Sequence, residues 1–90
     1  IEDLSIVIPV LNEARYISKL LNSISKQVDK NLEVIVVDGL SEDNTISIVE
    51  SFYSKIENLC IISSKRGIGY QRNIGAKKAK YDHLLFLDAD

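Results

Sequence analysis

Four short runs of apolar residues, many of them β-branched, constrain the fold of this chain more than any other feature. The runs span 4–8, 32–37, 59–62 and 83–87. Near-continuous apolar strands of this kind are typical of a parallel sheet that is buried on both faces. Between the first two runs, Ile17, Leu21 and Ile24 recur at helical spacing. The strand–helix order, repeated three times and followed by a strand, predicts an α/β fold with helices on both faces of the sheet.

Turn and capping residues predict where these elements begin and end. Pro9 cannot donate to a strand ladder, so we expect it to end the first strand. Asn12 is expected to cap the first helix, and Ser41 or Asp43 is expected to cap the second. Gly67 and Gly69 interrupt the chain before a third helix, which is predicted over 70–79.

Length and composition exclude several classes of function. Ninety residues make one small domain, and a formal net charge of −2 provides no basic surface for nucleic acid. No apolar run approaches the roughly 20 residues needed to cross a bilayer. The single cysteine, Cys60, lies in an apolar run and can form no internal disulfide, which fits a reducing compartment. We therefore expect a cytoplasmic protein with a buried structural thiol.

Charged residues gather where the predicted strands end, which is where open parallel sheets bind ligands. Glu13 follows the first strand, Asp38 ends the second, and Asp88 and Asp90 follow the fourth. A Lys-Arg pair at 65–66 follows the third strand. Carboxylates are ligands for divalent cations, and cationic side chains pair with phosphate. This edge of the sheet therefore predicts a site for a metal ion and a diphosphate.

Each of these residues also has an ordinary structural interpretation. Asp38 could accept a hydrogen bond from a nucleotide base, or it could build a turn with Gly39. Glu13 could contact a nucleoside, or it could offset the dipole of the following helix. Arg72 could pair with phosphate, hold an acidic loop or point into solvent. The residue types alone leave these alternatives open.

Four segments, in this order and at this spacing, resemble the motifs of family 2 glycosyltransferases, which have the GT-A fold. Residues 5–13 (SIVIPVLNE) resemble the opening strand and turn of that family. Residues 36–45 (VVDGLSEDNT) resemble its V-V-D-[DG]-G-S-x-D-x-T segment. Residues 69–75 (GYQRNIG) resemble its G-x-x-x-A-R-N-x-G helix, and residues 84–90 (LLFLDAD) resemble its strand ending in D-x-D.

The resemblance implies that residues 1–90 are the nucleotide-diphospho-sugar-binding part of a GT-A domain, with strand order 3-2-1-4 and without the acceptor-binding part. The implied nucleotide-sugar-binding residues are Pro9, Val10, Glu13, Asp38, Arg72 and Asp88. Within this set, Asp38 would bind the base, and Arg72 would support the diphosphate or the Asp38 loop. Asp88 would reach the ribose or metal-bound water, and Asp90, with Asp88, would hold Mn²⁺ or Mg²⁺.

The implied activity is inverting transfer of a sugar from a UDP- or GDP-sugar to an acceptor hydroxyl. Inverting transfer needs a general base, and the base of the family would lie beyond residue 90. The chain also begins without methionine and stops just after its fourth strand. We therefore expect a fragment that is inactive alone and that self-associates through the apolar surface left uncovered. Many members of the family act on lipid-linked acceptors at the cytoplasmic face of a membrane, and the residues of this chain leave open whether its parent protein does so.

Three positions depart from the family pattern. Gly39 stands where many members have a second aspartate, and Leu40 stands where most have glycine. Gln71 stands where alanine is common. Leu40 makes the loop after the second strand less typical, which weakens any inference about the sugar.

Two other classes of protein share parts of this pattern. A nucleotidyltransferase would carry a glycine-rich, basic loop after the first strand, but residues 10–13 contain neither glycine nor lysine. A non-catalytic nucleotide-binding or receiver module is the second alternative. A receiver would need a phosphorylatable aspartate after the third strand, where this chain has Ser63 and Ser64.

Overall fold

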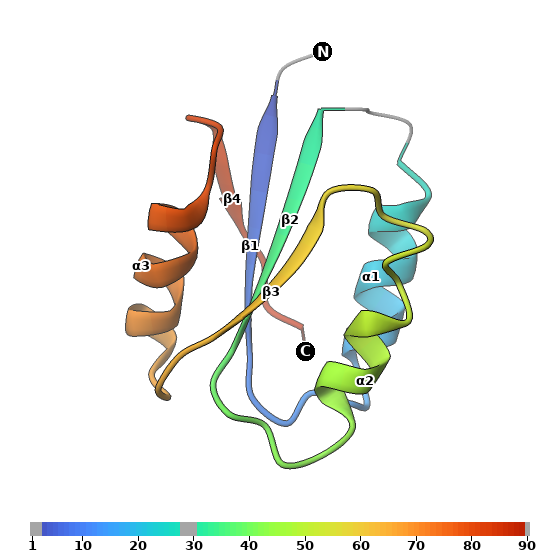
Figure 1. Ribbon diagram of the computed structural model, residues 1–90, viewed down its shortest axis with the longest axis vertical. Helices are drawn as coiled ribbons and strands as arrows, with labels where there is room; N and C mark the ends of the chain where they lie inside the picture. Colours follow the sequence, from blue (N-terminus) through green and yellow to red (C-terminus); the bar gives the residue numbers. More distant parts are fainter. Residues whose placement is uncertain (1–2, 28–30, 90) are drawn as a thin grey trace.

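Strands and helices alternate along the whole chain, and the computed structural model describes residues 3–27 and 31–89. The elements are β1 (Leu4–Val10), α1 (Ile17–Ser25), β2 (Leu32–Asp38), α2 (Thr45–Glu50), β3 (Leu59–Ser63), α3 (Ile68–Lys78) and β4 (Leu84–Phe86). The strands form one parallel sheet in the order β3-β2-β1-β4. Helices α1 and α2 cover one face and α3 covers the other (Figure 1). The predicted three-layer fold and its strand order are both confirmed.

The sheet separates two hydrophobic clusters, because successive strand residues point to opposite faces. In β1, Ile6 and Ile8 pack with the residues of α1 and α2, whereas Val7 packs with residues on the α3 side. The cluster under α1 and α2 is the larger and holds most of the buried apolar side chains. Cys60 packs, partly buried, against the smaller cluster, and this burial raises the pKa of its thiol above the ordinary 9.0. The thiol is thus only partly buried, whereas a buried thiol was predicted, and its raised pKa disfavours the reactive thiolate form.

Helix α3 approaches the sheet closely because Gly75 has no side chain. A Cβ at this position would lie 2.3 Å from Cγ1 of Val7 and 3.1 Å from Cγ2 of Val37. Atoms do not approach that closely, so any larger residue would push the helix outward. The buried residues of α3 are Gln71 and Gly75, which are four residues apart and therefore share the face toward the sheet.

The prediction that Pro9 ends the first strand is wrong, because β1 continues through Pro9 to Val10. Odd-numbered residues of β1 bond to β4: the Ser5 N–H donates to the His83 carbonyl, and the Val7 carbonyl accepts from Leu87. The nitrogen of Pro9 faces the same side. The β1–β4 ladder extends only to Val7, so the missing N–H of Pro9 interrupts no ladder bond.

The prediction that Asn12 caps the first helix is also wrong. Helix α1 begins at Ile17, with Tyr16 in the capping position and no side-chain cap. Asn12 instead adopts a left-handed backbone conformation with φ of 54°, which asparagine tolerates better than most residues. Its side chain and its N–H bond to the loop after β2, so neither is available to the helix.

The fourth strand is shorter than predicted and lies at the edge of the sheet. Its three residues, Leu84, Leu85 and Phe86, keep 38–42% of their surface exposed.

Among the described residues, no helix is both long and apolar enough to cross a bilayer.

Candidate functional site

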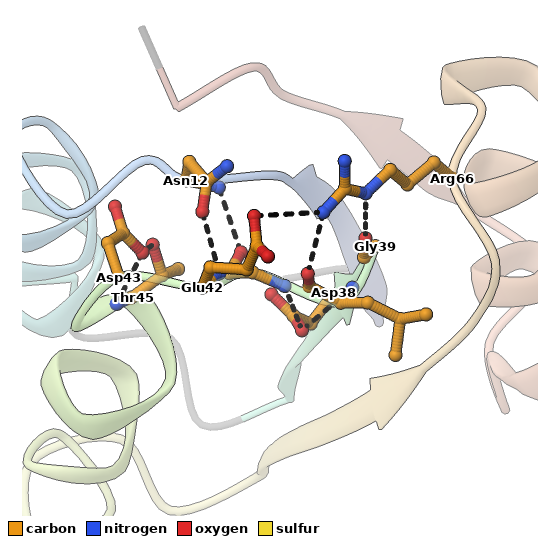
Figure 2. Close-up of polar contacts among 9 residues, drawn as sticks. Asn12, Asp38, Gly39, Glu42, Asp43, Thr45 and Arg66 are labelled. Atoms are coloured by element: carbon orange, nitrogen blue, oxygen red, sulfur yellow. Dashed lines mark hydrogen bonds and ion pairs between the residues drawn. The ribbon is translucent and has the colours of Figure 1, made fainter.

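The loops after β1 and β2 are joined by reciprocal hydrogen bonds at the carboxyl edge of the sheet. The Asn12 N–H donates to Oγ of Ser41 at 2.8 Å, and Oδ1 of Asn12 accepts from the Glu42 N–H at 2.8 Å (Figure 2). Ser41, which was predicted as a possible helix cap, therefore contacts the other loop instead. These bonds fix the positions of two chain segments that are about 30 residues apart in sequence.

Asp43 and Thr45 extend this connection toward the start of α2. The carboxylate of Asp43 accepts from the N–H and the hydroxyl of Thr45 through Oδ1, and from the Ala14 N–H through Oδ2. Oγ1 of Thr45 accepts from the Glu13 N–H at 2.9 Å. The hydrogen bond from the Thr45 hydroxyl is the main cause that lowers the pKa of Asp43 below 3.8. The prediction that Asp43 is the capping residue of α2 is wrong, because Asn44 holds the capping position without a side-chain cap. Asp43 instead bonds to Thr45, the first residue of α2, and holds the loop after β1.

Asp38 ends β2 with its carboxylate buried, and its two oxygens differ in their surroundings. Oδ2 accepts from the N–H groups of Leu40 and Ser41 at 3.1 and 3.0 Å (Figure 2). Oδ1 is buried and has no hydrogen-bond partner in the described part of the chain. A buried carboxylate oxygen without a donor is unfavourable, so it is a point at which a ligand donor could bind.

Arg66 reaches the same loop from the segment between β3 and α3. Its Nε donates to the Gly39 carbonyl and its Nη2 donates to the Leu40 carbonyl, each at 3.1 Å. Its guanidinium also lies 3.6 Å from the exposed Glu42 carboxylate (Figure 2). From the sequence, Arg66 was expected to lie in a basic loop that pairs with phosphate. In the structure its guanidinium bonds instead to the carbonyls of residues 39 and 40.

A pocket of about 260 Å³ opens between the end of β1 and the start of α3. Its lining residues are Pro9, Val10, Leu11, Glu13, Gly67, Ile68 and Gln71. Three of the residues predicted to bind a nucleotide sugar therefore line one cavity. Asp38 adjoins it, because Asp38 pairs with Val10 in the sheet and the next residue, Gly39, donates to the Val10 carbonyl at 2.9 Å.

Gln71 is a site residue for which no role was predicted from the sequence. Its side chain is 3% exposed, and Nε2 donates to the carbonyls of Val10 and Val37 at 3.0 and 2.8 Å. Its Oε1 accepts from the Gly67 N–H at 3.2 Å. Gln71 lies four residues before Gly75, so both residues share the helix face toward the sheet. A buried polar side chain on that face must find hydrogen-bond partners, and this spacing is the sequence signal from which a role of Gln71 could have been predicted.

Arg72 and Asp88 form a separate pair at the end of β4. Nη2 of Arg72 lies 3.4 Å from Oδ1 of Asp88, and the guanidinium lies 6.0 Å from the centre of the Phe86 ring. Nε of Arg72 is buried and has no partner in the described part of the chain. Arg72 thus contacts Asp88 and Phe86 at the end of β4, and Arg66 is the arginine that contacts the loop after Asp38.

The predicted metal ligands fall only partly within the described residues. Asp88 lies two residues beyond the end of β4, and its side chain is 55% exposed. Asp90 lies outside the described residues. Over residues 3–27 and 31–89, no group of three or more His, Cys, Asp or Glu side chains is placed to hold a metal ion. Two carboxylates can still hold Mg²⁺ when phosphate oxygens and water complete its coordination.

The carboxyl edge of the sheet therefore combines a mostly apolar pocket, a buried carboxylate oxygen without a partner among the described residues, and an exposed carboxylate paired with arginine. An apolar pocket with a few polar groups beside it suits a small ligand that carries both apolar surface and polar groups. Pro9, Val10 and Glu13 lie at the pocket and Asp38 lies beside it, whereas Arg72 and Asp88 lie at the end of β4.

Comparison with known proteins gives a family match over nearly the whole chain. Residues 5–90 match the model of the family described as Glycosyl transferase family 2. The chain is 38% identical over 91 residues to the poly(ribitol-phosphate) beta-N-acetylglucosaminyltransferase TarS of Staphylococcus aureus. That match covers 96% of this chain and 16% of TarS.

Solved structures share the fold at similar levels of identity. A crystal structure of S. aureus TarS 1-349 in complex with UDP-GlcNAc matches with a TM-score of 0.91 and 38% identity, over 98% of this chain and 26% of that one. The mannosyltransferase PcManGT from Pyrobaculum calidifontis, in complex with GDP-Man and Mn²⁺, matches with a TM-score of 0.88 and 29% identity, over 98% and 27%. The chain thus spans less than a third of the length of each of these proteins.

Proposed function

This chain belongs to glycosyltransferase family 2, and we propose that it binds the nucleotide sugar in an enzyme that transfers a sugar from a nucleoside diphosphate sugar to an acceptor hydroxyl. Both solved relatives described above are complexes with a nucleotide sugar, UDP-GlcNAc in one and GDP-Man in the other. They support a nucleotide-sugar donor for this chain, and we keep both UDP- and GDP-sugars as candidates.

The observation that carries the proposal is the unpartnered Oδ1 of Asp38. A ring N–H of a nucleotide base would supply the donor that this oxygen lacks, and hydrogen bonds to a carboxylate are among the stronger ones in proteins. The other oxygen, Oδ2, is held by the N–H groups of Leu40 and Ser41, which fixes the orientation of the carboxylate. Because Oδ1 is buried, neighbouring atoms must move aside when the base binds.

The pocket beside Asp38 would receive the nucleoside. Pro9, Leu11 and Ile68 provide apolar surface for the faces of a ring, and Glu13 provides a carboxylate at the same cavity. Val10 connects the pocket to Asp38 through the sheet register.

The diphosphate would lie toward the end of β4, where Arg72 and Asp88 lie. Asp88 is exposed and its contact with Arg72 is long, so its carboxylate remains accessible to a cation. We propose that Asp88 and Asp90 would hold Mn²⁺ or Mg²⁺. When bound, such an ion offsets the charge of the diphosphate and so favours departure of the nucleoside diphosphate. Arg72 would neutralise charge on the same side of the site.

We further propose that transfer is inverting. An inverting enzyme needs a general base to deprotonate the acceptor hydroxyl. We propose that a part of the protein other than these 90 residues contributes this base. The 90-residue chain alone should therefore turn over no nucleotide sugar.

Titration of the full-length protein with UDP and with GDP, each with and without Mn²⁺, tests the proposal. We expect one nucleotide to bind and Mn²⁺ to tighten its binding. Asp38→Asn should weaken binding about tenfold or more, because the carboxylate becomes a weaker acceptor. Asp90→Ala should abolish the effect of Mn²⁺ while leaving metal-free binding nearly unchanged.

Asp82→Asn is the matched control, because Asp82 is an exposed aspartate outside the site. It should bind nucleotide with the affinity of the unchanged protein. Failure of both nucleotides to bind, under conditions in which the protein is folded, would contradict the proposal. Binding that responds equally to Asp82→Asn and Asp38→Asn would contradict the role of Asp38.

A further inference from the structure

We propose that Gln71 is a positioning residue of the nucleotide site and that Gly39 and Gln71 form a size-matched pair. The inference rests on the proposed function. Gln71 holds the ends of β1 and β2 against the start of α3, and a side chain at residue 39 would press on the Gln71 amide, which occupies the adjoining space.

The hydrogen bonds of Gln71 connect three parts of the site. Nε2 donates to the carbonyl of Val10, which lines the pocket, and to the carbonyl of Val37, which precedes Asp38. Oε1 accepts from the N–H of Gly67, which also lines the pocket. A shift of this one amide would therefore move the pocket wall and the base of the Asp38 loop together.

The same amide changes which acceptors the pocket offers. The Val10 carbonyl accepts from Nε2 of Gln71 and from the Gly39 N–H, so both of its lone pairs are occupied. This carbonyl is then unavailable to a ligand, and the neighbouring buried acceptor without a partner is Oδ1 of Asp38. Gln71 thereby directs a base N–H toward Asp38.

The glycine at position 39 is explained by space and not by backbone conformation. The described glycine with a positive φ is Gly67, whereas Gly39 has an ordinary backbone. A Cβ at residue 39 would lie 3.0, 3.1 and 3.2 Å from Oε1, Cδ and Nε2 of Gln71. These distances are shorter than ordinary van der Waals contact, so a Cβ at residue 39 would push the amide by a few tenths of an ångström, and a longer side chain would push it further from its partners.

A double-mutant cycle in the full-length protein tests this coupling. The variants are Gly39→Asp, Gln71→Ala and the double variant Gly39→Asp/Gln71→Ala, with the dissociation constant for the nucleotide measured well below the melting temperature. Gln71→Ala loses the positioning hydrogen bonds and should itself weaken binding. Gly39→Asp should weaken binding about tenfold when Gln71 is present but change it little in the Gln71→Ala background, because alanine at 71 vacates the space that the new carboxylate needs.

Gln71→Met separates positioning from simple filling of space. Methionine has nearly the same volume but donates no hydrogen bond, so it should weaken nucleotide binding by a factor similar to that of Gln71→Ala while keeping the packing. A structural role alone would lower the melting temperature of these variants without changing the dissociation constant.

The outcomes separate this inference from the proposed function. If the unchanged protein binds neither UDP nor GDP, the proposed function fails. If the unchanged protein binds and Gly39→Asp weakens binding by the same factor in the Gln71→Ala background as in the unchanged protein, the size-matched pair is wrong. If Gln71→Met and Gln71→Ala both bind like the unchanged protein, Gln71 does not position the site.

Discussion

Arg66 bonds to the backbone of Gly39: its Nε donates to the Gly39 carbonyl at 3.1 Å, which ties the segment after β3 to the loop after β2. A second bond of 3.1 Å, from Nη2 to the Leu40 carbonyl, makes the contact bidentate. Two backbone carbonyls of the Asp38 loop thus depend on one side chain that is itself half exposed. The loop after β2 is therefore held by the Arg66 side chain as well as by the hydrogen bonds that Asp38 accepts from its own loop.

Replacement of Arg66 should loosen this loop. In Arg66→Ala we expect the amide hydrogens of Leu40 and Ser41 to exchange about tenfold faster, since loss of two hydrogen bonds makes local opening easier. Hydrogen-exchange NMR of the full-length protein measures this directly. Lys65→Ala is the matched control, because the Lys65 ammonium lies over the Tyr70 ring and away from the loop carbonyls. Unchanged exchange at residues 40 and 41 in Arg66→Ala would show that the loop does not need this contact.

Two glycines of α3 should respond oppositely to the same substitution. Gly75→Ala places a Cβ 2.3 Å from Val7, so we expect it to lower the free energy of unfolding by about 2–3 kcal/mol through overpacking. Gly69→Ala meets no atom within 4 Å and should raise it by about 0.5–1 kcal/mol, because alanine restricts the unfolded chain. Urea denaturation of both variants checks the pair. A stable Gly75→Ala protein would mean that α3 can move outward at little cost.

The fold was accessible from the sequence because it depends on a repeated local pattern. Near-continuous apolar residues in β1 and β2 bury both faces of the sheet, and such runs predict a parallel sheet covered by helices. The order of the strands came from the family resemblance, since local pattern does not determine which strands are neighbours. The acidic carboxyl edge, with Glu13 and Asp38, followed from the same logic, whereas Pro9 and Val10 were implied as site residues by the family resemblance.

Side-chain contacts between distant loops could not be predicted in this way. Asn12 and Ser41 resemble helix caps when only neighbouring residues are considered, but in the structure they bond to each other's loops. Gln71 reaches the carbonyls of Val10 and Val37 only because α3 lies so close to the sheet. That distance is set by Gly75, whose effect appears only when the helix and the sheet are placed together.

Leu40 carries backbone strain that a glycine would relieve. Its φ of 67° lies in the left-handed region, which costs a residue with a Cβ about 1 kcal/mol, and its side chain is 57% exposed. We expect Leu40→Gly to raise the free energy of unfolding by about 0.5–1 kcal/mol, since little apolar burial is lost. Leu40→Ala keeps the Cβ and should give no gain, which makes it the matched control. Chemical denaturation that ranks Leu40→Gly at or below Leu40→Ala would contradict this.

Asp43 should make stability depend on pH in the acid range. The hydrogen bond from the Thr45 hydroxyl lowers the pKa of Asp43 below 3.8 in the folded protein. A lowered pKa stabilises the folded state above the unfolded value, and the stabilisation is lost as pH falls through the folded value. The melting temperature should therefore fall as pH drops below about 4, and the fall should be shallower in Asp43→Asn.

Thr45→Val removes the hydroxyl donor and should flatten the same part of the profile, although its melting temperature is lower at every pH. Equal slopes below pH 4 in the unchanged protein and in both variants would show that this hydrogen bond does not favour the ionised carboxylate.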